Sequence, residues 1–134
     1  MPNSLRVAIA QLNPVVGDID GNLDRIRRAR KAAGDAHLVV CGELALAGYP
    51  PEDLVLKRAF QERMQAAAST LAAETRDGGP AVLFGAPWQV KGMLHNAAIL
   101  VDGGGVAAAR LKYDLPNYGV FDEKRVFAPG PLPE

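Results

Sequence analysis

The stretch HLVVCGELALAGYPPEDL, residues 37–54, decides the fold class of this chain. It begins with an apolar run at 38–41 and then becomes a loop rich in glycine and proline. A short apolar run without alternation is typical of a strand buried on both faces, as in a parallel sheet. His37 lies at the entrance of this strand, and we interpret it as structural. The stretch therefore predicts a buried strand that is followed, two residues beyond 41, by the carboxylate of Glu43.

On both sides of this stretch, strand patterns alternate with helix patterns. Apolar runs predict further strands at 5–12 and 81–86, and apolar residues at helical spacing predict helices at about 20–34 and at 58–76. In the second helix the predicted buried positions are Phe60, Met64, Ala67 and Leu71.

The last part of the chain predicts an antiparallel hairpin. Its strands are expected at 94–101 and 106–111, because Asp102-Gly103-Gly104-Gly105 can supply the positive φ angles of a tight turn. The order strand, helix, strand, helix, strand, hairpin indicates a mixed α/β layer fold. Residues 128–134 are rich in proline, and we expect them to end in the open.

The first helix carries a basic cluster that has two interpretations. Asp18, Asp20 and Asn22 are candidate N-terminal caps, and the nearby acidic residues offset the basic charge. We therefore prefer the solvated face of an amphipathic helix to a phosphate-binding patch. The basic residues are Arg25, Arg27, Arg28, Arg30 and Lys31.

Composition and charge narrow the function classes. The 134 residues are 49% hydrophobic, enough for one domain with a core, and 15 basic residues balance 15 acidic ones. This balance gives no support for a nucleic-acid or membrane partner. A single cysteine excludes an intramolecular disulfide and a four-cysteine zinc site, and the two histidines make a poor case for a metal. With no signal-peptide pattern and no apolar run near the roughly 20 residues of a membrane span, we expect a cytoplasmic protein.

Two charged residues stand directly after apolar runs. Glu43 follows the second predicted strand, and Lys112 follows the last one. Active sites of α/β proteins gather at the ends of strands, where burial raises the pKa of a carboxyl group and lowers that of a lysine. The alternatives are two strand-terminating surface charges or a structural ion pair. Spacing alone does not show that two residues 69 positions apart meet.

Three segments resemble the nitrilase, or carbon–nitrogen hydrolase, superfamily, and more narrowly the glutaminase domain of glutamine-dependent NAD synthetases. They are RVAIAQLNPVVGDIDGN (6–22), ELALAGYPPEDL (43–54) and KYDLPNYGVFDEKRVF (112–127), in the family's order. The resemblance implies the N-terminal half of a nitrilase-like αββα sandwich. Residues 1–134 would be the N-terminal portion of a glutamine amidotransferase domain, without the ATP-using synthetase domain.

The resemblance also implies a Glu-Lys-Cys triad that hydrolyses glutamine through a thioester. Glu43 would be the general base for the thiol, and Lys112 would stabilise the oxyanion. The ammonia released would amidate deamido-NAD in the synthetase domain, where ATP and Mg would act. This segment itself is expected to hold no metal or cofactor. The partners implied are glutamine and the remaining domains, in a homo-oligomer.

Weaker assignments follow from the same resemblance. Glu123 would be a second carboxylate near the triad that orients the lysine or the substrate. Tyr118 and Phe121 would face the glutamine pocket as substrate-binding residues, and Tyr49 would lie near the route by which ammonia leaves. Tyr49 and Phe121 are equally compatible with packing roles. Glu123 is equally compatible with a surface pair to Lys124 or Arg125.

The sequence departs from the family pattern at two points. The nucleophilic cysteine of the family lies beyond the lysine motif, so we expect this segment to be inactive alone. Cys41, at the end of a buried strand, is interpreted as a small hydrophobic residue. Gly42 stands where the family usually has proline, which is expected to loosen the backbone before Glu43.

Two rival hypotheses stay open. One is a stand-alone amidase, nitrilase or carbamoylase of the same superfamily. The other is a truncated, non-catalytic interaction module, which would need no nucleophile.

Overall fold

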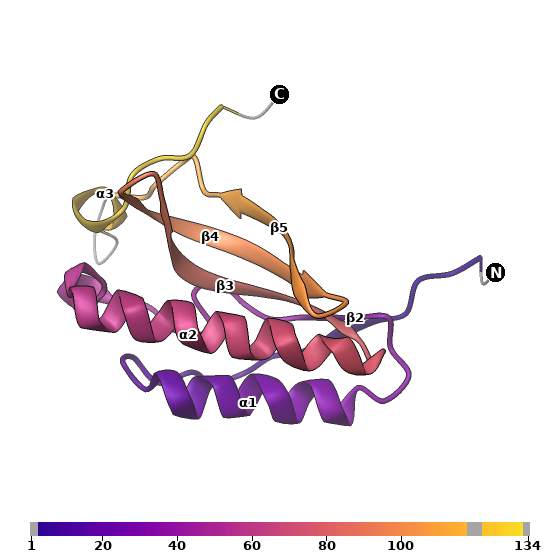
Figure 1. Ribbon diagram of the computed structural model, residues 1–134. Helices are drawn as coiled ribbons and strands as arrows, with labels where there is room; N and C mark the ends of the chain where they lie inside the picture. The colour runs from indigo at the N-terminus through magenta and orange to yellow at the C-terminus, as the bar shows by residue number, and fades with distance from the viewer. Residues whose placement is uncertain (1–2, 118–121, 133–134) are drawn as a thin grey trace.

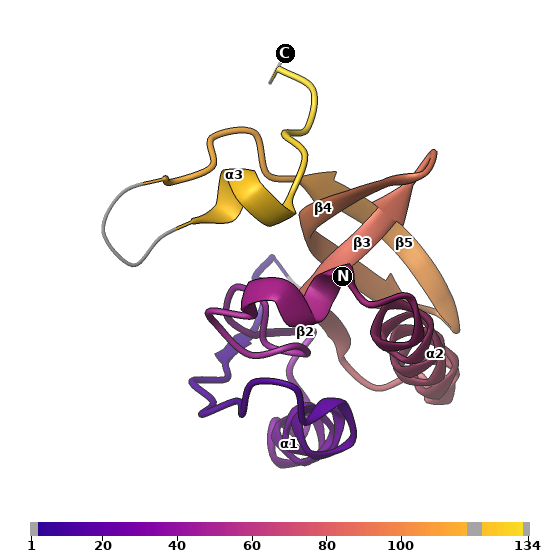
Figure 2. The ribbon, with the colours of Figure 1, turned by 90° about the vertical axis from the view of Figure 1, so that its left-hand side faces the viewer.

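The computed structural model describes residues 3–117 and 122–132. In this part of the chain a five-stranded sheet runs in the order β1-β2-β3-β4-β5. Figures 1 and 2 show α1 and α2 side by side on one face of the sheet, with α3 at a distance from both. The strands are β1 (Val7–Ile9), β2 (Leu38–Val40), β3 (Ala81–Val90), β4 (Met93–Asp102) and β5 (Gly105–Leu111). The helices are α1 (Ile19–Ala32), α2 (Arg58–Glu74) and α3 (Glu123–Val126), with 3₁₀ turns η1 (Glu52–Leu56) and η2 (Thr75–Asp77).

The sheet has a parallel part and an antiparallel part. β1, β2 and β3 are parallel and pair over only three residues each, so the first strand is much shorter than the predicted 5–12. β3, β4 and β5 form an antiparallel meander. The hairpin of β4 and β5 is confirmed, and Gly103 and Gly104 have positive φ in its turn.

The third strand is longer than predicted, and a hairpin turn was missed. β3 continues from the predicted 81–86 to Val90, and a turn at Lys91 and Gly92, both with positive φ, leads into β4. β2 pairs with β3 only as far as Leu83. At Pro87 the partner of β3 is therefore β4 alone, and a proline is compatible with a strand that is paired on one side.

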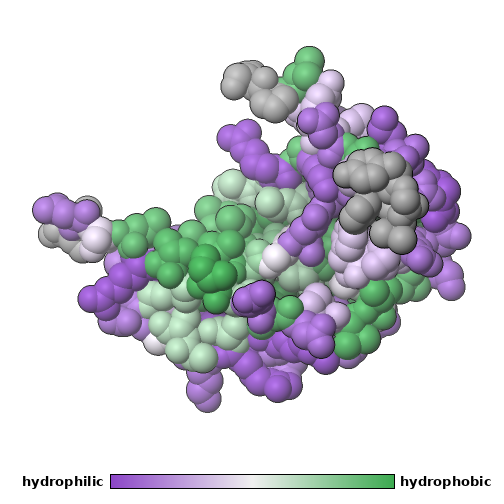
Figure 3. Space-filling view, turned by 180° about the vertical axis from the view of Figure 1, so that it is seen from behind, coloured by the Kyte–Doolittle hydropathy of each residue, from purple (hydrophilic) through white to green (hydrophobic). Residues whose placement is uncertain are grey.

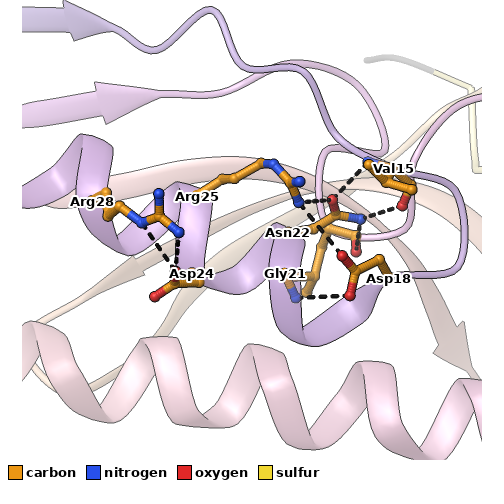
Figure 4. Close-up of polar contacts among 8 residues, drawn as sticks. Val15, Asp18, Gly21, Asn22, Asp24, Arg25 and Arg28 are labelled. Atoms are coloured by element: carbon orange, nitrogen blue, oxygen red, sulfur yellow. Dashed lines mark hydrogen bonds and ion pairs between the residues drawn. The ribbon is translucent and has the colours of Figure 1, made fainter.

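Helix α1 begins as the sequence indicates, but only one of the three candidate caps acts as one. The Asp18 carboxylate accepts a hydrogen bond from Gly21 N at 3.0 Å. Asn22 lies inside the helix, is buried, and bonds to the backbone of Val15 and to Leu46 O (Figure 4). Asn22 thereby ties the loop after β1 to the loop after β2.

Four of the five basic residues of α1 take part in ion pairs, which supports the amphipathic interpretation. Arg28 pairs with Asp24 one turn away (Figure 4). Arg27 pairs with Glu74 of α2, and Arg30 pairs with Asp77. These pairs lie on the surface and between the two helices.

The core lies between the helices and the sheet. All four residues predicted as the buried face of α2 are buried, and so are Val82, Phe84, Ile99 and Val101 of the sheet. This helix-covered face contributes apolar burial of the kind that dominates folding stability.

The opposite face of the sheet, here called the open face, is not covered by the described residues. Val39 is fully buried towards the helices, but Leu38 and Val40 are only half-buried, so burial of this strand on both faces is wrong for this chain. Ile9 is 76% exposed. Figure 3 shows hydrophobic surface beside the N-terminal segment.

The beginning of the C-terminal segment is hydrogen-bonded to the sheet, so the expectation that it ends in the open is wrong for 128–130. Ala128 N donates to Leu94 O at 2.7 Å, and Gly130 N donates to Lys112 O at 2.8 Å. The segment 128–130 therefore lies along the ends of β4 and β5. None of the described helices is long and apolar enough to cross a membrane.

Candidate functional site

Glu43 lies in a tight turn directly after β2. The carbonyl of Gly42 accepts hydrogen bonds from Ala45 N at 3.3 Å and Gly85 N at 3.2 Å. Leu44 is fully buried and has a φ of 50°, an uncommon backbone conformation for a leucine. These contacts hold the backbone on both sides of Glu43, which counters the loosening expected from Gly42.

Gly85 of β3 makes this turn possible. A Cβ at Gly85 would lie 2.2 Å from Leu44 N and 2.8 Å from the carbonyl carbon of Glu43. The turn therefore lies directly on the backbone of β3. A glycine is required here for a close approach of two main chains.

Lys112 is placed by the ends of β4 and β5. Its N–H donates to Asn96 O at 2.8 Å, and its carbonyl accepts from Gly130 N at 2.8 Å. The ammonium of Lys112 lies 2.5 Å from Oε1 of Glu43. The structure thus brings together the two residues that follow separate apolar runs, and the ion pair expected as an alternative is present.

Glu123 joins the same cluster from the short helix α3, which the sequence did not predict. It is 3% exposed, and its Oε1 lies 3.1 Å from Lys112 Nζ. Tyr49 donates from its hydroxyl to Oε2 of Glu123 at 3.3 Å. The surface pairing of Glu123 with Lys124 or Arg125 is therefore wrong; Arg125 pairs with Asp122 and Asp53 instead.

The two remaining predicted substrate residues cannot be placed. Tyr118 and Phe121 lie outside the described residues. They remain expectations from the family resemblance.

Asn96 is a member of the site that the sequence reasoning missed. Its amide nitrogen donates to Glu43 Oε1 at 2.8 Å and to Glu123 Oε1 at 3.0 Å. The signal was a buried polar residue inside the run HNAAILV of β4, where the neighbours at 97, 99 and 101 are apolar and buried. A buried amide needs hydrogen-bond partners, so such a residue in a strand indicates polar company.

Two carboxylates share one ammonium in this cluster. Burial lowers the pKa of Lys112, but hydrogen bonds to Glu43 and Glu123 outweigh burial, so its pKa is raised overall. The expectation that burial alone would lower this pKa is therefore wrong, and Lys112 stays a cation at neutral pH. Burial, followed by the charge of Glu123, raises the pKa of Tyr49.

Cys41 lines the same open pocket as Glu43 and Lys112, a cavity of about 380 Å³. Burial raises the pKa of the Cys41 thiol to about 11. A thiol with this pKa is almost entirely protonated at neutral pH and is a poor nucleophile. These properties agree with its interpretation as a small hydrophobic residue.

His37 is bonded to the backbone, as expected for a structural residue. Its Nδ1 accepts from Arg6 N at 2.8 Å, which links it to the chain just before β1. Among the described residues, no group of three or more His, Cys, Asp or Glu side chains could hold a metal ion.

The cluster offers a carboxylate beside an ammonium that is charged at neutral pH, at the rim of an open pocket. This pair can accept a proton and stabilise a negative charge within a few ångströms of each other. The profile of the carbon-nitrogen hydrolase family matches residues 6–133. The chain belongs to the carbon–nitrogen hydrolase family.

The chain is similar in sequence and in structure to glutamine-dependent NAD synthetases. The chain is 44% identical over 128 residues to a glutamine-dependent NAD(+) synthetase of Thermotoga maritima, covering 94% of this chain and 22% of that one. The structure of glutamine-dependent NAD+ synthetase from Acinetobacter baumannii matches with a TM-score of 0.89 at 37% identity, over 96% of this chain and 24% of that one. The chain therefore spans less than a quarter of the length of these relatives.

A smaller relative shows the same fold. A mutant of the amidase from Nesterenkonia sp. AN1, with acrylamide added at its active-site cysteine, matches with a TM-score of 0.83 at 31% identity. It is covered over 51% of its length by 97% of this chain. The mixed α/β fold of the nitrilase superfamily, expected from the sequence, is thus confirmed.

Proposed function

We propose that these residues form the N-terminal part of the glutaminase domain of a glutamine-dependent NAD synthetase. The single observation that carries the proposal is the contact of Lys112 Nζ with Glu43 Oε1 at 2.5 Å, with Glu123 buried beside it. Support comes from relatives of that name at 37–44% identity. A cytoplasmic location and a homo-oligomeric state belong to the proposal.

In this proposal Glu43 acts as the general base. It takes the proton of a cysteine thiol, and the thiolate attacks the side-chain carboxamide carbon of glutamine. Lys112 stabilises the oxyanion of the tetrahedral intermediate, since its ammonium is held at the rim of the pocket. As the intermediate collapses, the proton on Glu43 passes to the leaving nitrogen, which departs as ammonia and leaves a thioester.

The second half of the cycle uses the same groups. Glu43 takes a proton from water as the water attacks the thioester, and the carbon–sulfur bond breaks to release glutamate and the thiol. The ammonia would pass a route near Tyr49 to the synthetase domain and amidate activated deamido-NAD. In this proposal ATP and Mg act in the synthetase domain, and the steps given above use side chains of the glutaminase domain.

The nucleophile in this proposal is a cysteine outside the 134 residues. Cys41 is the one cysteine in the sequence, and its pKa of about 11 makes it unsuited to the role. We accordingly expect no glutamine hydrolysis from residues 1–134 alone. Glutamine hydrolysis by this segment that disappears in Cys41→Ser would contradict this assignment.

The proposal is tested in the full-length protein by comparing two nitrogen sources. Glu43→Gln should abolish NAD formation from glutamine, because the base is lost, while NAD formation from ammonium salts continues at the wild-type rate. The ammonia reaction is the internal control for folding and for the synthetase domain. Glutamine-dependent NAD formation that survives in Glu43→Gln would show that the role of Glu43 is wrong.

A stand-alone amidase is the second candidate, and the match to the Nesterenkonia amidase over half its length favours it. The same Glu-Lys cluster would serve either activity. Short aliphatic amides distinguish the two in the full-length protein. Turnover of these amides without any NAD formation from deamido-NAD, ATP and glutamine would favour the amidase.

A further inference from the structure

Asn96 lies between the two carboxylates of the site, and the chemistry above gives it no task. It is 3% exposed, and its backbone is held in β4 opposite Pro87 of β3. We propose that Asn96 is a positioning residue that holds Glu43 and Glu123 on one ammonium and leaves a single oxygen of Glu43 as the base. The catalytic half of this inference rests on the proposed function.

The geometry is a closed arrangement of donors and acceptors. A side-chain amide has two N–H hydrogens, and those of Asn96 go to two different carboxylates, at 2.8 Å and 3.0 Å. The ammonium of Lys112 contacts the same two oxygens, Oε1 of Glu43 and Oε1 of Glu123, at 2.5 Å and 3.1 Å. Two donors therefore bridge two acceptors that come from the β2 turn and from α3.

Between Glu43 and Glu123, a neutral hydrogen-bond donor such as the Asn96 amide suits the proposed base better than a second cation. Two carboxylates repel each other, and one ammonium offsets only one of the two charges. A second cation would bind the carboxylate form of Glu43 and oppose its taking a proton. The amide supplies a hydrogen bond to each carboxylate without adding charge, which a buried group such as Glu123 needs.

The arrangement also selects one oxygen of Glu43. Both Asn96 and Lys112 donate to Oε1. Oε2 is consequently the oxygen available to accept a proton. The Glu43 side chain is 46% exposed at the rim of the pocket, so a reacting group can reach it.

The kinetic test uses the full-length protein. Asn96→Ala is expected to lower kcat for glutamine hydrolysis roughly 10–100-fold through misplacement of the base, with KM within about threefold of wild type. Ile99→Ala, on the same strand but in the helix-covered core, is the control and should keep kcat despite its loss of stability. An Asn96→Ala protein with wild-type kcat would overturn the proposal.

A second measurement does not depend on activity. Asn96→Asp replaces the donor with a third carboxyl group that faces Glu43 and Glu123. Lys112 bonds to both of these carboxylates, the Tyr49 hydroxyl bonds to Glu123, and Arg110 and Cys41 line the same pocket. The repulsion raises the pKa of the new carboxyl in the folded state, so the folded protein binds a proton that the unfolded chain releases. The loss of melting temperature relative to wild type should therefore be large at pH 8 and smaller at pH 5.

The two measurements separate the two possible failures. If the wild-type protein hydrolyses no glutamine, the proposed function is wrong, and the melting measurement alone decides whether Asn96 holds the carboxylates. Equal losses of melting temperature at pH 5 and pH 8 would show that Asn96 does not bridge them. A pH-dependent loss together with a reduced kcat supports both halves of the proposal.

Discussion

The two faces of the sheet differ in what covers them and in what they carry. The helix-covered face is closed by α1 and α2, and its side chains Phe84 and Ile99 are 0–1% exposed. The open face carries half-buried and exposed apolar residues, and the polar cluster of Glu43 and Lys112 lies at its edge. The buried core that stabilises this chain and the cluster proposed to be catalytic therefore lie on opposite sides of one sheet.

The largest expected effect is on the rate of glutamine hydrolysis, and it compares the loss of one lysine from each side of the sheet. Lys112→Met should lower glutamine hydrolysis by the full-length protein about 10³-fold, because the oxyanion loses its stabilising charge. Lys31→Met, on the exposed surface of α1, is the matched control and should leave the rate unchanged. Steady-state ammonia release measures both. Similar rates in the two variants would remove the functional distinction between the faces.

The next effect concerns the backbone contact that links the two regions. Gly85→Val places a side chain against Leu44 N and the Glu43 backbone, so the turn that carries Glu43 must move. We expect a loss of about 1–3 kcal/mol in the free energy of unfolding. Displacement of the base should lower glutamine hydrolysis about 10²-fold. Denaturant unfolding and ammonia release check the two parts, and a Gly85→Val protein with wild-type activity would contradict the close approach.

The same substitution, made once on each face, compares how much each face contributes to the free energy of unfolding. In the 134-residue chain, Ile99→Ala should cost about 2–5 kcal/mol of unfolding free energy, because it leaves a cavity in the closed core. Ile9→Ala on the open face should stay within about 0.5 kcal/mol, because that side chain is 76% exposed. Urea unfolding gives both values. A cost for Ile9→Ala equal to that for Ile99→Ala would mean that a further layer or a second copy covers the open face.

The smallest expected effect concerns Cys41. With a pKa raised to about 11 by burial, its thiol should react with iodoacetamide more slowly than free cysteine at pH 8, and faster as the pH rises towards 11. The protein should lose stability over the same rise, since the unfolded chain gives up the thiol proton first. Cys41→Ser should leave glutamine hydrolysis by the full-length protein within about twofold of wild type. Rapid alkylation at pH 7 would contradict the protonated state of this half-buried thiol.

Helix α2 and the last hairpin were predictable because their patterns are local. The four apolar positions of α2 repeat at helical spacing, and the glycines after Asp102 specify a tight turn. β1 was predicted too long and β2 too buried. The length of a strand depends on its partner strands, and its burial depends on what covers the sheet. The turn at Lys91 and Gly92 was missed for a related reason, because the end of β3 at Val90 depends on its pairing with β4.

The candidate site divides in the same way. Glu43 and Lys112 could be found in the sequence, because each is a charged residue that ends an apolar run. The resemblance placed Glu123 near Lys112, in agreement with their contact, but the residues alone did not predict its burial, because neighbouring Lys124 and Arg125 offered simpler local partners. Asn96 was missed because its partners come from segments 53 and 27 positions away.

The sequence by itself determined the α/β class, the helix-covered core and the family, since these depend on periodicity and on contiguous motifs. The family resemblance placed Glu43, Lys112 and Glu123 in one site, and only the tertiary structure decided that Asn96 joins them and that Glu123 is buried. The physical reason is that a charge assembly exists only when sheet pairing brings distant segments within hydrogen-bond distance. For the same reason the pKa of Lys112 is raised, where burial considered alone predicted a lower one.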